Sequence, residues 1–341
     1  MRRLYLDIGS TNIKSMISDG GKCEEVFRTP FPPPVLDENG RFEVDPQSIL
    51  DAVLPVVGKA GCGEVFISTQ MHGYLLADAR GEPVTRYISW QDRRAEHSGV
   101  RIGISAESGT SMKANLPRAG VAVIASELPE VFARAAEFFT LGSYLAWALT
   151  GNNATHITDA AASGYYNVKR HTAENFPLRL PQALYEVRPT GTYRGSLVYA
   201  PMGDQQCAVK GAGGNEETLI LNLGTAAQMC TVAKGFVSGE FESRPYFGGD
   251  TLCTVTGLSG GKRLHSLDGK ESAVNELAEE YAAAARRLPP RKKLLITGGA
   301  FAYYRSLLKE ALEKLAVPYT VNEGADALEG LKLISEEISN G

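Results

Sequence analysis

Asp204 is the side chain whose type and setting most suggest chemistry. It follows a small-residue turn at Gly203 and precedes a helix that we predict from Gln205 to Ala212. Gly203 permits the turn, and Asp is a favoured residue at a helix N-terminus. A carboxylate held in this way can accept a proton from a hydroxyl group within hydrogen-bond reach. An ordinary helix cap would also explain Asp204.

Downstream of Asp204 the sequence predicts a hairpin with a bare tip. Two β-type runs, Thr218–Leu223 and Gln228–Val232, flank the turn Gly224–Thr225. A tip without bulky side chains presents its N–H groups and the Thr hydroxyl outward, which is one way to hold a phosphate. Taken alone, an ordinary hairpin turn also fits this segment.

The same tip occurs a second time, at the N-terminus. The run Leu6–Asn12 matches Leu221–Ala227 position by position, as apolar, Asp or Asn, apolar, Gly, hydroxyl, small and small. The two copies are too far apart for a solenoid repeat. The simplest interpretation is a two-lobed protein in which each lobe carries one hairpin.

Size and composition limit the class of protein. The 341 residues, 43% of them hydrophobic and 22% charged, can bury one large core or two moderate ones. A formal net charge of −4 gives no reason to expect nucleic acid or an anionic membrane as a partner. Five scattered cysteines without a C-x-x-C pair favour reduced, mostly buried thiols. With no signal-peptide pattern and no membrane-length apolar run, we expect a cytoplasmic protein.

Two polar clusters follow predicted strands in the N-terminal half. Gln70-Met71-His72-Gly73 follows the strand Glu64–Ser68, and Trp90-Gln91-Asp92 lies at the end of the strand Tyr87–Trp90. A flat apolar ring beside an amide and a carboxylate suits a sugar, whose C–H face packs on the ring while its hydroxyls bond the polar groups. His72 taken alone would more often be a structural histidine.

The remaining elements are predicted from periodicity, caps and turn residues. Arg188–Val198 is turn-rich, and we place the hinge between the lobes there. The loop Gly257–Lys262 is either a flexible surface loop or backbone that lines a nucleotide site, and Thr297–Ala300 is a bare turn of the kind that lets a ribose or purine lie against the backbone. Helices are predicted at Asp45–Gly58, Ser126–Phe139, Ser143–Leu149, Glu271–Leu288 and Asp326–Ile338, and a buried strand at Lys293–Ile296.

Five motifs, in this order, resemble those of the FGGY carbohydrate kinases. Each motif alone is weak, but five in order are specific, and the resemblance spans about residues 4 to 265. The segments Leu149–Gly151 and Thr158–Asn167 look like those of sedoheptulokinases in particular. The five motifs are Asp7–Thr11, Gln70–Gly73, Trp90–Arg94, Gly203–Gln206 and Leu223–Thr225.

The resemblance implies an α/β fold with two lobes, of the actin-like or ribonuclease H-like kind, and an active site in the interlobe cleft. We place an N-terminal sugar-binding lobe with the first phosphate hairpin at residues 1–198. Residues 199–341 would form a shortened C-terminal nucleotide-binding lobe that carries the catalytic Asp and the second hairpin.

The resemblance also implies an activity, which is ATP-dependent phosphorylation of a ketose with sedoheptulose preferred. The cofactors are ATP and Mg²⁺, the partners are a small-molecule sugar and ATP, and a homodimer is the oligomeric state to test. Asp204 would be the general base, and Asp7, which otherwise is a turn-stabilising residue, would meet a hydrated Mg²⁺. The implied sugar-binding residues are Gln70, Met71, His72, Trp90, Gln91, Asp92 and Gln205; the implied nucleotide-binding residues are Ser10, Thr11, Asn12, Gly224, Thr225, Gly260, Gly298 and Gly299.

The second lobe departs from the family pattern. About thirty residues separate Gly260–Gly261 from the strand at Leu294, where the family usually carries a long further stretch, and Ala226 stands where a Ser is common. Two alternatives therefore stay open. One is a kinase for another sugar, such as xylulose or a polyol, and the other is a sugar- or nucleotide-binding regulator without turnover. An acetate-kinase-like or heat-shock-like ATPase would share the hairpins but has no reason to carry the clusters at Gln70 and Trp90.

Overall fold

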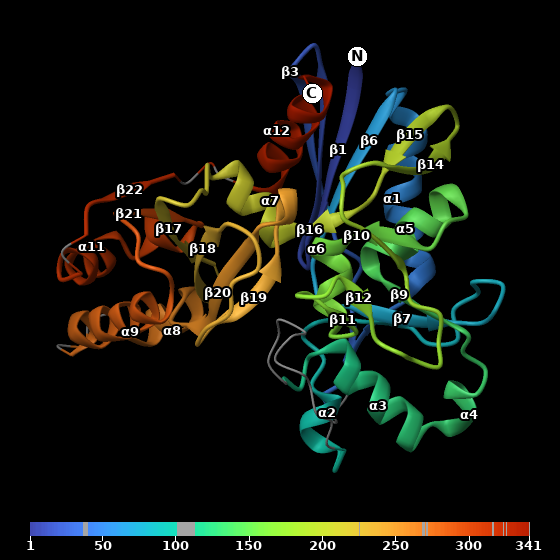
Figure 1. Ribbon diagram of the computed structural model, residues 1–341, viewed down its shortest axis with the longest axis horizontal. Coiled ribbons are helices and arrows are strands. Elements are labelled where there is room, and N and C mark those ends of the chain that lie inside the picture. Colours follow the sequence, from blue (N-terminus) through green and yellow to red (C-terminus); the bar gives the residue numbers. More distant parts are fainter. Residues whose placement is uncertain are drawn as a thin grey trace. The chain divides into compact units, whose positions relative to one another are not determined.

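The computed structural model (Figure 1) describes residues 1–36, 40–100, 113–224, 226–267, 270, 272–315, 317–322, 324 and 326–340. Their contacts divide the chain into two units, Met1–Cys207 with Leu331–Gly341, and Ala208–Gly330. The chain passes from one unit to the other twice, within helix α7 (Asp204–Gly211) and within helix α12 (Ala327–Asn340).

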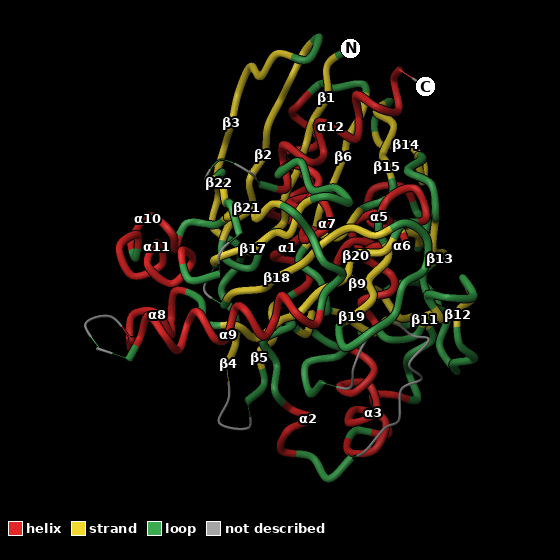
Figure 2. The backbone as a smooth tube through the Cα atoms, turned by 60° about the vertical axis from the view of Figure 1, so that its left-hand side comes forward, coloured by secondary structure: helices red, strands yellow, loops and turns green. Residues whose placement is uncertain are grey.

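The first unit is organised around a seven-stranded mixed sheet (Figure 2). β1 and β2 form the N-terminal hairpin, β3 continues it antiparallel, and β6 pairs with β1 in parallel on the other side. β6 is in turn a parallel partner of β15 and, nearer its C-terminal end, of β16. The strands are β1 (Arg2–Ile8), β2 (Asn12–Asp19), β3 (Lys22–Pro30), β6 (Glu64–Thr69), β14 (Pro189–Tyr193), β15 (Ser196–Tyr199) and β16 (Met202–Gly203).

The helices of this unit begin where the sequence supplies caps. Asp45 caps α1 (Pro46–Ala60), because its Oδ2 accepts the N–H of Ser48 at 3.0 Å, and the helix ends at Gly61 in the left-handed region. Thr140 and Ser143 form a reciprocal capping box at α5 (Leu141–Thr150). Both helices bury apolar side chains in one core with β1 and β6. The other helices are α2 (Arg94–His97), α3 (Pro117–Glu127), α4 (Pro129–Phe132), α6 (Ile157–Ala160) and a 3₁₀ turn (Ala161–Ser163).

Smaller sheets complete the first unit. A five-stranded sheet in the order β4-β5-β8-β7-β9 carries the predicted sugar-binding clusters, and two pairs, β10 with β13 and β11 with β12, lie outside it. These strands are β4 (Val35–Leu36), β5 (Phe42–Val44), β7 (Tyr74–Ala77), β8 (Tyr87–Ile88), β9 (Glu137–Thr140), β10 (Ala154–His156), β11 (Tyr166–Asn167), β12 (Thr172–Ala173) and β13 (Gln182–Leu184).

The second unit repeats the strand arrangement of the first. Its hairpin β17–β18 continues antiparallel to β20, and β17 pairs in parallel with β21, as β1 does with β6. The repeat of the bare tips in the sequence is therefore a repeat of strand order. The elements are β17 (Thr218–Leu223), β18 (Ala227–Ala233), β19 (Glu242–Pro245), β20 (Thr251–Leu258), β21 (Lys293–Thr297), β22 (Tyr319–Val321), α8 (Gly261–Leu267), α9 (Ala273–Arg287), α10 (Ala300–Tyr303), α11 (Arg305–Glu313) and a 3₁₀ turn (Phe247–Gly249).

The division between the units differs from the predicted boundary at residues 198 and 199. β16 pairs with β6, so the turn that carries Asp204 belongs to the first unit and not to the second. The last helix also returns to the first unit, where the buried hydroxyl of Tyr5 on β1 lies 2.8 Å from Ser335 Oγ on α12. The turn-rich segment Arg188–Val198, predicted as the hinge, contributes to β14 and β15 of the first sheet. Its backbone groups are hydrogen-bonded between strands, so it is not a free linker.

The predicted helix at Ser126–Phe139 is wrong. Pro129 follows the end of α3 and begins the separate four-residue helix α4, because proline cannot continue the preceding helix. Phe138 and Phe139 lie on β9, fully buried and paired with β7. Two aromatic residues in succession suit a strand that is buried on both faces. The helical period predicted for this apolar run is therefore wrong.

Replacing Ser335 with Ala tests the docking of α12 on β1. Ser335 Oγ donates to Lys332 O at 2.8 Å and therefore accepts from the Tyr5 hydroxyl. Its loss leaves the buried Tyr5 donor without this acceptor, so the free energy of unfolding should fall by about 1–3 kcal/mol in urea denaturation.

Two further variants make this measurement specific. Ser339→Ala, on the exposed part of the same helix, should cost less than about 0.5 kcal/mol, because the bond that Ser339 Oγ accepts from the Arg3 guanidinium is exposed to water. In a Tyr5→Phe background most of the cost of Ser335→Ala should disappear, because the donor is already absent. Equal costs for Ser335→Ala and Ser339→Ala would mean that α12 is not docked in this way.

Candidate active site

Three neighbouring strands of the first sheet end at the same edge and bring the predicted site residues together. In register, Ile8 of β1 lies opposite Thr69 of β6, and Gly203 of β16 lies opposite the same Thr69. The next residues along the chain are Gly9, Gln70 and Asp204. Because the carboxyl ends of parallel strands open to one side, the first hairpin tip, the Gln70 loop and the candidate base lie side by side.

Asp204 is the first residue of α7, half-buried, and its Oδ1 accepts the N–H of Gln205 at 2.8 Å. The start of the helix is thus one residue earlier than predicted. The positive end of a helix favours a carboxylate there. The pKa of the buried Cys207 thiol is raised well above its usual value, first by burial and then by the nearby charges of Asp7 and Asp204. Both carboxylates therefore approach the same thiol, and Cys207 is an inert packing residue.

Asp7 is mostly buried at the end of β1. Its Oδ1 accepts the hydroxyl of Ser68 at 3.0 Å, and its Oδ2 lies 3.4 Å from Nζ of Lys14. Among the described residues no group of three or more His, Cys, Asp or Glu could hold a metal ion. A single carboxylate beside a bare turn fits Mg²⁺, which usually keeps several waters and binds through one or two carboxylates and substrate phosphates.

The side-chain amide of Gln70 is buried and has no hydrogen-bond partner among the described residues. Gln70 is 3% exposed, and within the described part of the chain neither Oε1 nor Nε2 has a hydrogen-bond partner. Buried amides are almost always hydrogen-bonded, and water or a polar ligand would supply the bonds that the described residues do not. A sugar offers hydroxyl groups that both donate and accept, which matches an amide.

His72 and Met71 are fixed by their surroundings. His72 has a φ of 63°, in the left-handed region that non-glycine residues rarely adopt, and its Nδ1 donates to the carbonyl of Ala162 at 2.9 Å. Such backbone strain often occurs at functional sites. The sulfur of Met71 lies 2.9 Å from where a Cβ on Gly203 would stand, so a glycine is needed for the close approach of the two loops.

The predicted cluster Trp90–Asp92 lies close to the cluster Gln70–Gly73, but only part of it fits a role in sugar binding. β7 and β8 are antiparallel with Tyr74 opposite Ile88, so Trp90 and His72 lie at the same end of this pair. Trp90 is 36% exposed, as a sugar-stacking ring requires. Asp92, however, has a structural role. Its carboxylate accepts hydrogen bonds from the N–H of Phe42 and from the backbone and guanidinium of Arg94, so its oxygens are already used by the protein.

The predicted nucleotide-binding glycines of the second unit gather at the end of β17. Gly261 donates its N–H to the carbonyl of Gly224 at 2.8 Å. A Cβ on Gly260 would stand 2.5 Å from the backbone of Ala226, and one on Gly298, where φ is +89°, 2.6 Å from the carbonyl of Leu223. Backbone packed this closely leaves a surface without side chains, which suits a phosphate or ribose.

Gly299 and Thr225 complete the predicted nucleotide-binding residues of the second unit. A Cβ on Gly299 would meet nothing within 4 Å, so this glycine faces open space and has room for a ligand. Thr225, also predicted to bind nucleotide, lies outside the described residues.

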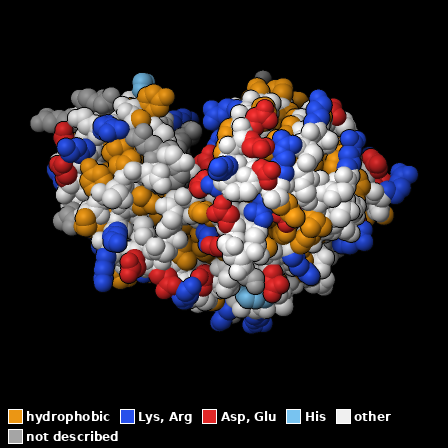
Figure 3. Space-filling model, turned by 90° about the horizontal axis from the view of Figure 1, so that it is seen from above, with side chains coloured by type: hydrophobic (Ala, Val, Ile, Leu, Met, Phe, Trp, Pro, Cys, Tyr) orange, Lys and Arg blue, Asp and Glu red, His pale blue; other side chains and the backbone are white. Residues whose placement is uncertain are grey.

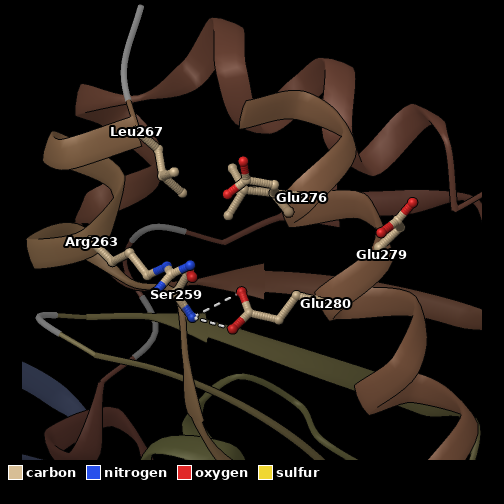
Figure 4. Close-up of a pocket in the computed structure, with 7 residues that line it drawn as sticks. Ser259, Arg263, Leu267, Glu276, Glu279 and Glu280 are labelled. Atoms are coloured by element: carbon tan, nitrogen blue, oxygen red, sulfur yellow. Dashed lines mark hydrogen bonds between the residues drawn. The ribbon is translucent and has the colours of Figure 1, made fainter. Parts of the chain in front are cut away.

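The loop before Gly260 is anchored by side chains of α9. This contact is not predicted from the sequence. The N–H of Ser259 donates to Oε1 and Oε2 of Glu280 at 3.2 and 3.1 Å, and the hydroxyl of Tyr281 donates to Ser259 O at 2.7 Å. Figure 4 shows the two bonds between Ser259 and Glu280, which line a pocket of about 290 Å³ together with Arg263. Helical periodicity predicts which face of α9 is buried but not that its acidic residue anchors a loop.

A second group that the sequence analysis did not assign lies behind Asp204. His156, Thr158 and Asp159 are almost fully buried on β10 and α6. Burial raises the pKa of Asp159 to about 6, although the hydroxyls of Thr140 and Thr155, which bond its Oδ2 at 2.5 and 2.9 Å, act in the opposite direction. Thr158 and Asp159 entered the sequence analysis only as part of a resemblance, because neither burial nor bonding can be inferred from their spacing.

The outer surface shows charges of both signs. On the face seen in Figure 3, acidic and basic side chains are interspersed. Mixed charge does not concentrate polyanions as a basic patch would. Among the described helices, none combines the length and apolar character needed to cross a membrane.

Comparison with known sequences relates the chain to sugar kinases. A sequence model of the N-terminal domain of the FGGY family of carbohydrate kinases matches residues 3–175. The chain is 26% identical over 308 residues to a xylulose kinase of Streptomyces rubiginosus, an alignment that covers 77% of this chain and 62% of that protein. The chain thus spans less than two thirds of the length of this relative.

Comparison with solved structures confirms the predicted two-lobed α/β actin-like fold. The ligand-bound xylulose kinase of Lactobacillus acidophilus has a TM-score of 0.84 at 16% identity and covers 100% of this chain and 90% of its own. The glycerol kinase of Plasmodium falciparum with ADP has a TM-score of 0.80 at 13% identity, with the same coverages.

Gly298→Ala tests the close approach at the end of β17. A left-handed φ and a Cβ 2.6 Å from a carbonyl should lower the free energy of unfolding by at least about 1–3 kcal/mol. The matched control is Gly299→Ala, where φ is −70° and no atom lies within 4 Å. It should leave stability unchanged or raise it by less than about 1 kcal/mol. Similar melting curves for the two variants would contradict this geometry.

Asp159→Asn tests the buried carboxyl group through its pH dependence. With a pKa of about 6 in the folded state and 3.8 ordinarily, Asp159 binds its proton more tightly when folded. Its contribution to stability is therefore fully present below about pH 4 and is lost as the pH rises through 6, by up to about 3 kcal/mol.

An Asn side chain has no such dependence. The stability of Asp159→Asn relative to the unsubstituted protein should therefore rise between pH 4.5 and pH 8, as followed by urea denaturation at each pH. A difference that stays constant over this range would show that Asp159 titrates normally.

Proposed function

Because this chain belongs to the FGGY family of carbohydrate kinases, we propose that it transfers a phosphoryl group from ATP to a hydroxyl group of a ketose sugar. The observation that carries the proposal is the meeting of Asp204, the Gln70 amide and the first hairpin tip at one edge of the first sheet. A sugar kinase needs a base, groups that orient a polyhydroxylated substrate and a phosphate cradle, and residues suited to each of these roles lie at this edge.

Asp204 is the proposed general base. Its carboxylate would accept the proton of the sugar hydroxyl as that oxygen attacks the γ-phosphorus of ATP. Such a base contributes on the order of 10²–10⁴ to the rate, while the larger remainder comes from alignment of the two substrates and neutralisation of phosphate charge. It lies at the N-terminus of α7, where the helix dipole interacts favourably with a carboxylate.

The sugar would be held by the two clusters beside Asp204. The buried Gln70 amide bonds hydroxyl groups, Trp90 supplies an apolar face, and His72 is held rigidly by its bond to Ala162. Met71, Gln91 and Gln205 complete the proposed set. Asp92 is left out, because Arg94 and Phe42 already occupy its carboxylate.

The nucleotide would be bound through bare backbone. In the first unit we assign Ser10, Thr11 and Asn12 to the phosphates, with Asp7 meeting Mg²⁺, an ion that neutralises phosphate charge when it is bound. In the second unit the glycines at the end of β17 support the same role, since side chains there would fill the space a ribose or phosphate needs. These glycines are Gly224, Gly260, Gly298 and Gly299, and Thr225 remains part of the proposed nucleotide-binding set.

Sedoheptulose is the first substrate to test, and xylulose is the second. The segment Thr158–Asn167 resembles sedoheptulokinases, whereas the relative from Streptomyces rubiginosus is a xylulose kinase. A binding protein without turnover is the remaining alternative. It is favoured by the shortened second unit, in which only about thirty residues separate Gly260–Gly261 from the strand at Leu294, where the family usually carries a long further stretch.

Asp204→Asn tests the kinase proposal. The rate of ADP release with the preferred ketose should fall by about 10²–10⁴-fold, while the sugar dissociation constant measured by calorimetry changes less than about threefold. Asp51→Asn, at an exposed site on α1, is the matched control and should keep the full rate. An Asp204→Asn variant with near-normal turnover would show that another group is the base.

A ketose panel separates the alternatives. Turnover of sedoheptulose, xylulose or another ketose by the unsubstituted protein supports the kinase and identifies its substrate. Sugar-induced stabilisation in a thermal melt without ADP release from any sugar would instead support the binding protein.

A further inference from the structure

The turn that carries Asp204 is held from behind by a short chain of buried polar groups. The N–H of Gly203, the residue before Asp204, donates to Oγ1 of Thr158 at 3.1 Å. Thr158 Oγ1 lies 2.9 Å from Nδ1 of His156, and the N–H of Thr158 also points to this nitrogen, at 3.3 Å. All of these side chains are buried, His156 and Thr158 almost completely.

The direction of each hydrogen bond in this chain follows from its ends. Gly203 N–H can only donate, so Thr158 Oγ1 accepts there. His156 Nδ1 accepts from the N–H of Thr158 and is therefore unprotonated, so the Thr158 hydroxyl proton donates to it. The ring is also hydrogen-bonded to the backbone of Tyr185, and burial lowers the pKa of His156 to about 4, so it stays neutral at physiological pH. His156 thus fixes the rotation of the Thr158 hydroxyl.

Pro201, two residues before Gly203, is held as well. Its carbonyl accepts the N–H of His156 at 2.9 Å. Two of the three residues before Asp204 are therefore bonded to the segment 155–158. A Cβ on Gly203 would stand 3.1 Å from the carbonyl of Thr158 and 2.6 Å from Oε1 of Gln206, so this turn has little room to shift.

From these contacts we infer that Thr158 and His156 are positioning residues for Asp204. Thr158 fixes the backbone immediately before the base, and His156 holds the Thr158 hydroxyl in the orientation that leaves its oxygen free to accept from Gly203. Neither touches a reacting atom. The inference rests on the proposed role of Asp204, because a general base must lie about 2.6–3.2 Å from the sugar hydroxyl oxygen to accept its proton, and a small displacement of the carboxylate lowers the rate.

Thr158→Val is the principal test. Valine keeps the branched shape but has no acceptor for Gly203, so kcat should fall by about 10- to 100-fold with the KM for sugar changed less than about threefold. Thr158→Ser restores the hydroxyl and should recover most of kcat. At His156, His156→Asn retains an acceptor near the position of Nδ1 and should be milder than His156→Leu.

Thr251→Val is the matched control for the loss of a buried threonine hydroxyl. Thr251 on β20 also accepts a backbone N–H, from Val237 at 3.2 Å, and donates to a carbonyl, of Gly235 at 2.6 Å. It lies in no proposed site. Its substitution should cost similar stability and leave kcat within about twofold. Equal kcat in Thr158→Val and Thr251→Val would overturn the inference.

A readout that needs no catalysis separates this inference from the proposed function. Hydrogen exchange of the Gly203 amide, followed by NMR, should be at least about tenfold faster in Thr158→Val than in the unsubstituted protein and unchanged in Thr251→Val. If the protein shows no kinase activity but the Gly203 amide exchanges faster in Thr158→Val, the kinase proposal fails. The role of Thr158 in fixing the Gly203 backbone is then still supported. Unchanged exchange of the Gly203 amide in Thr158→Val would refute the role of Thr158 in fixing this backbone.

Discussion

The parallel pairing of β6 with β1 on one side and β16 on the other is the constraint on which the rest of the structure depends. One register places Gly9, Gln70 and Asp204 one step beyond the ends of three adjacent strands. A slip of one residue would turn every side chain of a strand to the opposite face and separate these groups. The buried apolar residues of β1 and β6 oppose such a slip, so the same core that stabilises the first unit also sets the geometry of its candidate site.

Polar groups around this edge fall into two kinds, and the difference between them bears on function. Asp92 and Thr158 bond backbone N–H groups, and Asp159 bonds the hydroxyls of Thr140 and Thr155. The Gln70 amide is buried at the same edge without a hydrogen-bond partner in the part of the chain that the structure describes. A rigid frame around an unsatisfied amide is what a binding site for a polyhydroxylated molecule requires, because the frame limits the entropy lost on binding and the ligand supplies the missing bonds.

Much of this arrangement could be predicted from the sequence, because it depends on local signals. The matched hairpin tips, the cap of α1 at Asp45 and the strand before Gln70 follow from turn residues, caps and apolar runs. What could not be predicted depends on distant pairing. The pairing of β16 with β6 assigns Asp204 to the first unit, and the bonds from Phe42 and Arg94 give Asp92 a structural role. Burial on both faces makes Phe138 part of a strand, although its neighbourhood in the sequence has the spacing of a helix.

A crystal structure of the protein with a ketose bound tests the central claim most directly. The account predicts that the sugar lies at the carboxyl ends of β1, β6 and β16, with one hydroxyl oxygen within about 3 Å of the Asp204 carboxylate and others bonded to the Gln70 amide. A sugar bound elsewhere, with the Gln70 amide bonded only to water and Asp204 out of its reach, would contradict it.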